Sequence, residues 1–74
     1  MGKFVPSKYT IENAILEATR YHGGIYVGDN YVIKDHGKYI EVCIDADNDK
    51  GHVTYNLYFD KEGKLISWKM HENK

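Results

Sequence analysis

Residues 52–59 alternate strictly between two sets of side chains, and this period of two constrains the fold of the whole chain. Successive side chains of an extended strand point to opposite faces. One face of this segment therefore carries Val53, Tyr55, Leu57 and Phe59, and the other carries His52, Thr54, Asn56 and Tyr58. Because turn-forming residues bracket the segment on both sides, we expect it to be a half-buried strand in the middle of an antiparallel sheet.

A single amphipathic helix is expected ahead of the strands. The apolar residues that recur along one helical face are Ile11, Ala14, Ile15, Ala18 and Tyr21 or His22. Ser7 and Thr10 are both candidate N-caps, and the Gly23-Gly24 pair is the predicted C-cap.

The rest of the chain has the pattern of short strands separated by turns. The segments expected to be strands are 31–34, 38–45, 52–59 and 64–70, and 24–27 would make a fifth. The expected connections are turns at 28–30, 35–37 and 60–63 and a loop at 46–51. We therefore predict a single α+β domain over residues 1–74, with one N-terminal helix packed on a four- to five-stranded antiparallel β-meander sheet in two layers.

The turns also predict how the strands align. The three predicted cross-strand pairs are Phe59 with Lys64, Ile44 with Val53, and Lys34 with Lys38. In this register the apolar sets of all the strands lie on the face that the helix covers. We call the opposite, uncovered side the outer face.

The outer face is predicted to carry an apolar row, although the solvated side of such a sheet is normally polar. The row contains Ile33, Tyr39, Tyr58 and Leu65, and the positions beside it include Tyr31, Glu41, Asn56 and Lys69. Tyrosine combines apolar area with a polar tip and is enriched at protein interfaces. We therefore take these eight residues as the candidate partner-binding set.

Three interpretations of the outer row remain open. Tyrosine and β-branched residues stabilise strands by cross-strand pairing without binding anything. A protein-binding or self-association surface is the second interpretation. The third is stacking of single-stranded bases or a nucleotide, but such binders add a cationic groove, and here only Lys34 and Lys69 lie nearby, with Glu41 opposing them.

The charge distribution excludes some partners. The net charge is −1, which argues against a protein that binds duplex DNA. Residues 35–60 contain six acids and two bases, and both flanks are mildly basic. No segment has the apolar length of a signal peptide or a membrane span, so we expect a cytoplasmic protein without a membrane partner.

An acidic loop is expected at Asp45, Asp47 and Asp49, whose spacing matches the start of a calcium-binding EF-hand loop. The match then fails, because Lys50 stands where glycine is needed and Asn56 stands in place of the bidentate glutamate. A solvated hairpin loop, or one that meets a basic partner, fits better. We predict no metal site.

Catalytic chemistry finds little support in the sequence. Cys43 is the single cysteine, and its predicted neighbours Thr54 and Glu41 include no base to activate it. The four histidines have no ligand spacing. No cofactor is expected.

The leading hypothesis is a small non-enzymatic protein-interaction module, such as a stoichiometric inhibitor or regulator of another protein. A 74-residue chain has little material for a deep cleft. By size class alone it is comparable to phage and mobile-element proteins that block bacterial defence enzymes, including anti-CRISPR proteins. The alternatives are a single-stranded nucleic acid or nucleotide binder and a homodimeric structural protein joined through outer faces or an edge strand.

Overall fold

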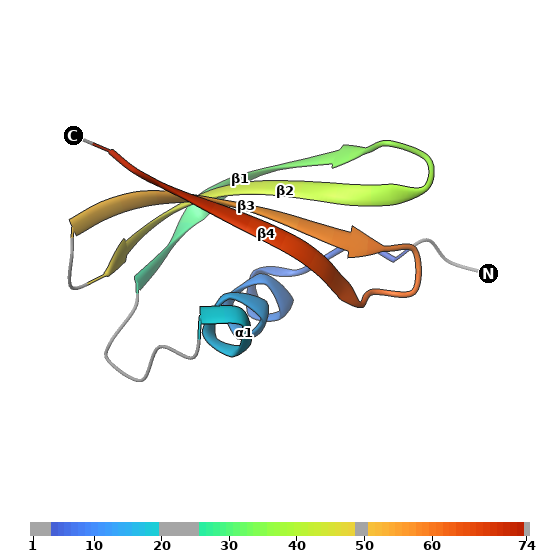
Figure 1. The fold of residues 1–74 in the computed structure, drawn as a ribbon, viewed down its shortest axis with the longest axis horizontal. Coiled ribbons are helices and arrows are strands. Elements are labelled where there is room, and N and C mark those ends of the chain that lie inside the picture. Colours follow the sequence, from blue (N-terminus) through green and yellow to red (C-terminus); the bar gives the residue numbers. More distant parts are fainter. Residues whose placement is uncertain (1–3, 20–25, 49–50, 74) are drawn as a thin grey trace.

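The computed structural model describes residues 4–19, 26–48 and 51–73. These residues form one helix followed by a four-stranded antiparallel sheet in the order β1-β2-β3-β4. The elements are α1 (Lys8–Thr19), β1 (Tyr26–Asp35), β2 (Tyr39–Asn48), β3 (Gly51–Asp60) and β4 (Leu65–Glu72). Figure 1 shows α1 on one side of the twisted sheet, so the predicted two-layer α+β meander is confirmed.

The helix begins at the predicted serine cap. The Thr10 backbone amide donates to the Ser7 side-chain oxygen at 3.2 Å, and the Ile11 amide donates to the Ser7 carbonyl at 2.9 Å. Ser7 is thus the N-cap, while Thr10 lies within the helix. The predicted C-cap at Gly23-Gly24 falls outside the described residues.

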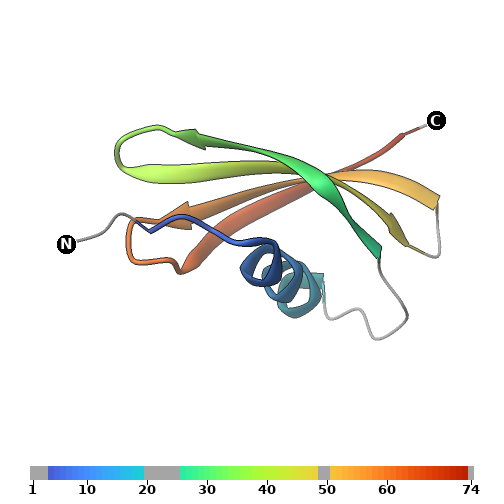
Figure 2. The ribbon, with the colours of Figure 1, turned by 180° about the vertical axis from the view of Figure 1, so that it is seen from behind.

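The core lies between α1 and the inner face of the two central strands. The four residues predicted to point inward from β3 are at most 2% exposed. They are joined by alternate residues of β2 and by one face of the helix, which are Ile40, Val42, Ile44, Ala46, Ile11, Ala14 and Ile15. The segment before α1 runs beside the β3–β4 turn (Figure 2), and there the Phe4 ring lies 5.7 Å from that of Phe59.

The first strand differs from the prediction of a short strand at 24–27 and a turn at 28–30. Instead, β1 continues through that turn with a bulge between Val27 and Tyr31. A Cβ atom on Gly28 would lie 3.2 Å from the Asp45 carbonyl oxygen, so glycine permits the close approach to β2. The glycine signal therefore marked a bulge, not a chain reversal.

The β1–β2 connection is tighter than predicted, and this reverses the faces of β1. The His36 amide donates to the Tyr39 carbonyl at 2.9 Å, which leaves only Gly37 and Lys38 in the turn. Relative to the predicted pairing of Lys34 with Lys38, the alignment changes by an odd number of residues. The side chains of residues 31–34 consequently lie on the face opposite to their predicted one.

Three residues show the effect of this reversal. Ile33 pairs with Val42 and Tyr31 pairs with Ile44, and both pack against the core. Val32, which the predicted pairing of Lys34 with Lys38 would place beside Ile40 on the inner face, pairs with Cys43 and is 56% exposed. The prediction that Ile33 and Tyr31 lie on the outer face is therefore wrong.

A second bulge places Leu65 on the face opposite to the predicted one. Leu65 pairs with Phe59, but the register then shifts, so that Tyr58 pairs with Ser67. Leu65 packs against the core instead of lying on the outer face, and Ile66 is 60% exposed. A bulge adds one residue to one strand, which a uniform alternation cannot anticipate.

The β2–β3 alignment is also displaced, but by an even number. Ile44 pairs with Tyr55 and not with Val53, which instead pairs with Ala46. A two-residue displacement keeps every side chain on its predicted face. Because β2 extends to Asn48 and does not end at the predicted residue 45, Asp45 and Asp47 both belong to a strand and not to an acidic loop.

We predict that Gly63→Ala destabilises the fold more than Gly37→Ala. Both glycines have positive φ, +95° and +90°, which costs an L-residue about 1–2 kcal/mol. A Cβ atom on Gly63 would also lie 2.9 Å from the Phe4 ring, whereas nothing lies within 4 Å at Gly37. Overpacking of this kind adds about 1–3 kcal/mol to the loss in unfolding free energy, measured by chemical denaturation.

The double variant separates the two causes. In a Phe4→Ala background, the ring contact is absent, so Gly63→Ala and Gly37→Ala should cost similar amounts. An unchanged difference between them would contradict the role of Phe4.

Candidate functional site

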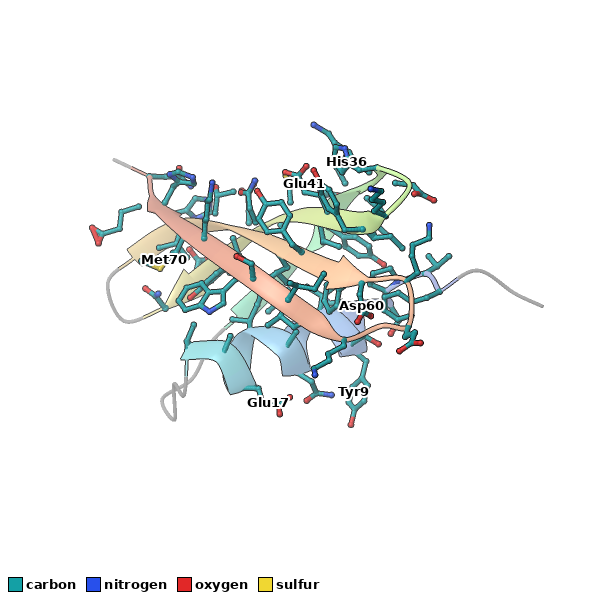
Figure 3. All side chains as sticks on the ribbon, turned by 45° about the vertical axis from the view of Figure 1, so that its right-hand side comes forward. Tyr9, Glu17, His36, Glu41, Asp60 and Met70 are labelled. Atoms are coloured by element: carbon teal, nitrogen blue, oxygen red, sulfur yellow. The ribbon has the colours of Figure 1, made fainter. Side chains whose placement is uncertain are left out.

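The outer face is built mainly from the two central strands. Figure 3 shows His36 and Glu41 on the side of the sheet opposite the helix residues Tyr9 and Glu17. The alternate positions of β2 and β3 that point to this face include Tyr39, Glu41, Cys43, Asn56 and Tyr58. Their spacing follows from the same period of two that buries the core residues between them.

Three rings form a contiguous group on this face, which we call the aromatic cluster: His36, Tyr39 and Tyr58. The rings of His36 and Tyr39 are stacked with centroids 4.6 Å apart, and Tyr58 meets Tyr39 edge-on at 6.0 Å. Tyr39 remains 37% exposed. Offset and edge-on contacts between rings are favourable, so the cluster holds its own shape.

Glu41 is the polar centre of the outer face. Its carboxylate lies 2.8 Å from His36 Nε2 and accepts a 3.1 Å hydrogen bond from the Asn56 side-chain amide. Its side chain is only 15% exposed. The hydrogen bond to His36 lowers the pKa of Glu41 despite the opposing effect of burial, and Asn56 and the Lys34 charge lower it further. The group therefore stays ionised at neutral pH.

The cysteine adjoining Glu41 is held as a thiol. Its Sγ lies 3.4 Å from the Asn56 amide nitrogen and 3.7 Å from a Glu41 carboxylate oxygen, to which the thiol donates. Burial raises the pKa of Cys43, and the negative charge of Glu41 raises it further. This environment is the reverse of the electropositive one that activates a catalytic cysteine.

The predicted acidic loop is not a loop in the part the structure describes. Asp45 accepts a 2.9 Å hydrogen bond from the Thr54 hydroxyl, and Asp47 lies 2.7 Å from His52 Nδ1. Both carboxylates are cross-strand partners on the outer face, because the strand alternation continues to Asn48. Asp49 lies outside the described residues. Among the described residues, no group of three or more His, Cys, Asp and Glu could hold a metal ion.

The structure brings together five of the eight predicted site residues. These are Tyr39, Tyr58, Glu41, Asn56 and Lys69. The other three, Ile33, Tyr31 and Leu65, pack against the core. Their misplacement follows from the odd register changes described above.

Two outer-face residues were missed, His36 and Val32. A two-residue turn at Gly37-Lys38 would have placed His36 directly opposite Tyr39 and turned Val32 outward. The local signal for that turn is the Asp35 carboxylate, which accepts a 2.8 Å hydrogen bond from the Gly37 amide.

Two open hollows lie on the surface of the described part of the chain. One, of about 570 Å³, lies between α1 and the β3–β4 turn and is lined partly by Ala14, Ala18 and Leu65. The other, of about 480 Å³, lies beside the β1 bulge and is lined partly by Val32 and Cys43. The second hollow is continuous with the outer face through Cys43.

Comparison with known proteins adds no relative. No known family model, curated protein sequence or solved structure matches the chain. Within the described residues, no helix is long and apolar enough to cross a membrane.

We predict that removing His36 raises the pKa of Glu41. His36 supplies the largest effect that lowers this pKa, so His36→Ala should move it upward, and Asn56→Ala should move it by a smaller amount. The measurement is an NMR titration of the Glu41 carboxyl carbon. A wild-type pKa at or above the ordinary 4.5 would contradict the assignment.

The same shift predicts a pH dependence of stability. Because the pKa of Glu41 is lower in the folded than in the unfolded chain, its ionised form stabilises the fold above the ordinary pKa. That contribution is lost as the pH falls through the folded-state value. The stability difference between wild type and Glu41→Gln should therefore shrink on acidification, as followed by denaturation midpoints.

We also predict that Cys43 reacts slowly with iodoacetamide. Its raised pKa leaves less thiolate near pH 8 than a cysteine in a short peptide has. Glu41→Gln removes one cause of the raised pKa, so alkylation should become several-fold faster. A rate equal to that of the peptide in the wild-type protein would contradict the assignment.

Proposed function

We propose that this chain is a non-enzymatic protein-binding domain that recognises a basic protein surface through its outer face. The observation that carries the proposal is the aromatic cluster, positioned around the ionised Glu41 on the sheet face opposite α1. Rigid aromatic side chains lose little conformational entropy on binding, and they are frequent anchors of protein interfaces. The cluster is therefore suited to act as a preformed anchor.

The charges on the outer face favour a partner with a basic surface. Strands β2 and β3 contain no Lys or Arg, and their outer positions carry four carboxylates, Glu41, Asp45, Asp47 and Asp60. The neighbouring tyrosine faces can receive a guanidinium or ammonium group by cation–π contact. A partner that presents arginine or lysine among apolar residues matches both features.

The same charge disfavours the nucleic-acid alternative. Glu41 has a lowered pKa and remains negative beside the rings on which bases would stack. Lys34 pairs with Glu41 and Lys69 pairs with Asn56, from the edge strands β1 and β4, and each of these two separate lysines lies beside a polar partner of β2 or β3 instead of in a run of cations. A phosphate backbone would meet carboxylates at the centre of the face.

Inhibition or regulation is the specific form of the proposal. Because the raised pKa of Cys43 disfavours a nucleophilic role for this residue, we propose that the domain acts by occupying a partner's surface. A one-to-one complex that blocks the partner's own site is the expected mode of action.

We predict that Tyr39→Ser combined with Tyr58→Ser weakens partner capture at least ten-fold. Both rings lie on the outer face and not in the core, so the variant should remain folded. The measurement is affinity capture from a lysate of the cells that encode the chain, with cross-linking and mass spectrometry. Capture should also weaken with salt, because charged pairs contribute to it.

The matched control is Tyr9→Ser. Tyr9 is a tyrosine on α1 that is 77% exposed, but it lies on the opposite side of the molecule (Figure 3). Tyr9→Ser should leave capture unchanged. If the Tyr39 and Tyr58 double variant retrieves the same proteins in the same amounts, the proposal fails.

A further inference from the structure

Strand β4 is an open edge of the sheet with exposed apolar side chains. Among the strands of the described residues, β3 lies on one side of it and none lies on the other. Ile66 is 60% exposed, and Trp68, whose ring lies 6.2 Å from that of Tyr55, is 38% exposed. Proteins usually protect such edges against pairing with another strand. The backbone groups and the apolar side chains of this edge are therefore available to pair with another strand.

The hydrogen-bond pattern tells which backbone groups of β4 are available. The Asn73 amide donates to the His52 carbonyl at 2.9 Å, so this pair is hydrogen-bonded. In an antiparallel ladder, bonded pairs alternate with non-bonded pairs. The backbone groups of Ser67, Lys69 and His71 thus point toward β3, while those of Trp68, Met70 and Glu72 point to the open edge.

We infer that β4 pairs with β4 of a second copy of this chain, antiparallel, about a two-fold axis at Met70. Met70 then lies opposite its own equivalent, Trp68 lies opposite Glu72, and Lys69 lies opposite His71. All three outward-pointing residues enter hydrogen-bonded pairs in both copies. The two sheets join into one sheet of eight strands, and the apolar side chains of Trp68 and Met70 from both copies become neighbours on the inner face.

Other symmetric registers are less complementary. An axis at Lys69 would place two lysines directly opposite each other, which is destabilising. An axis at Trp68 would set Met70 against Ile66, where the register shift interrupts the ladder. The regular part of β4 therefore favours the Met70 axis. The other edge is less suited, because a bulge divides β1.

The helix packs mainly on β3, one strand in from the open edge. The hollow between α1 and the sheet is lined by Lys64 and Leu65, at the start of β4, whereas Met70 lies near the other end of the strand (Figure 3). Antiparallel pairing about Met70 sends the two helices to opposite ends of the joined sheet. Both outer faces lie on the same side, so the dimer presents two aromatic clusters to a partner.

The first test uses the purified chain alone, so its outcome does not depend on the proposed partner. Light scattering should give twice the 8.6 kDa chain mass at high concentration. Glu72→Pro removes an outward N–H without removing a hydrogen bond to β3, and it should raise the dissociation constant at least ten-fold. Glu72→Ala, the matched control, should dimerise like wild type.

The second test determines which residues of the two β4 strands lie opposite each other. In a Cys43→Ser background, Met70→Cys places two thiols at an opposed pair whose Cα atoms are about 5.5 Å apart, within the range of a disulfide. Mild oxidation should cross-link this variant, whereas Trp68→Cys and Lys69→Cys should stay largely monomeric under denaturing electrophoresis.

The outcomes are decisive in both directions. A mass of 8.6 kDa at every concentration overturns the inference. Equal dissociation constants for Glu72→Pro and Glu72→Ala exclude edge pairing and point to a dimer through another face. Faster cross-linking of Trp68→Cys or Lys69→Cys than of Met70→Cys overturns the proposed axis.

Discussion

The uninterrupted pairing of β2 with β3 is the constraint on which the rest of the structure depends. Ten consecutive pairs, from Tyr39 with Asp60 to Asn48 with Gly51, continue without a register shift. Their inner side chains make most of the core, and their outer side chains make most of the candidate site. One backbone ladder therefore produces the hydrophobic stability of the domain and the geometry of its uncovered face.

Glu41 gives that uncovered face its organisation. A carboxylate with a 15% exposed side chain loses much of its hydration, and hydrogen bonds from its neighbours compensate for the loss. By holding His36, it also fixes the ring that stacks on Tyr39. The ionised carboxylate and the aromatic rings are thus joined in one group. This distinguishes them from separate tyrosines that only stabilise strands.

A predicted face was right where the strand alignment differed from the prediction by an even number of residues, and wrong where it differed by an odd number. The β2–β3 alignment was displaced by an even number of residues, so Glu41, Asn56 and Tyr58 lie on the outer face as predicted. The β1–β2 alignment changed by an odd number, and Ile33 moved to the core side. The helix, the fold class and the inner face of β3 were predictable because each depends on the period of one segment.

The sequence by itself determined the helix, the central part of each strand and which β3 side chains are buried, because side-chain period is a local property of a single element. Only the tertiary structure decided that Ile33 and Tyr31 of β1 and Leu65 of β4 join the core, whereas Met70 lies on its predicted inner face. With the two-residue turn after His36, Lys34 pairs with Glu41 instead of Lys38, and the bulge near Ile66 adds one residue to β4. Both changes in alignment are odd, and both depend on hydrogen bonding between strands. The same turn brought His36 onto Tyr39, and the strand order leaves β4 at the edge of the described sheet.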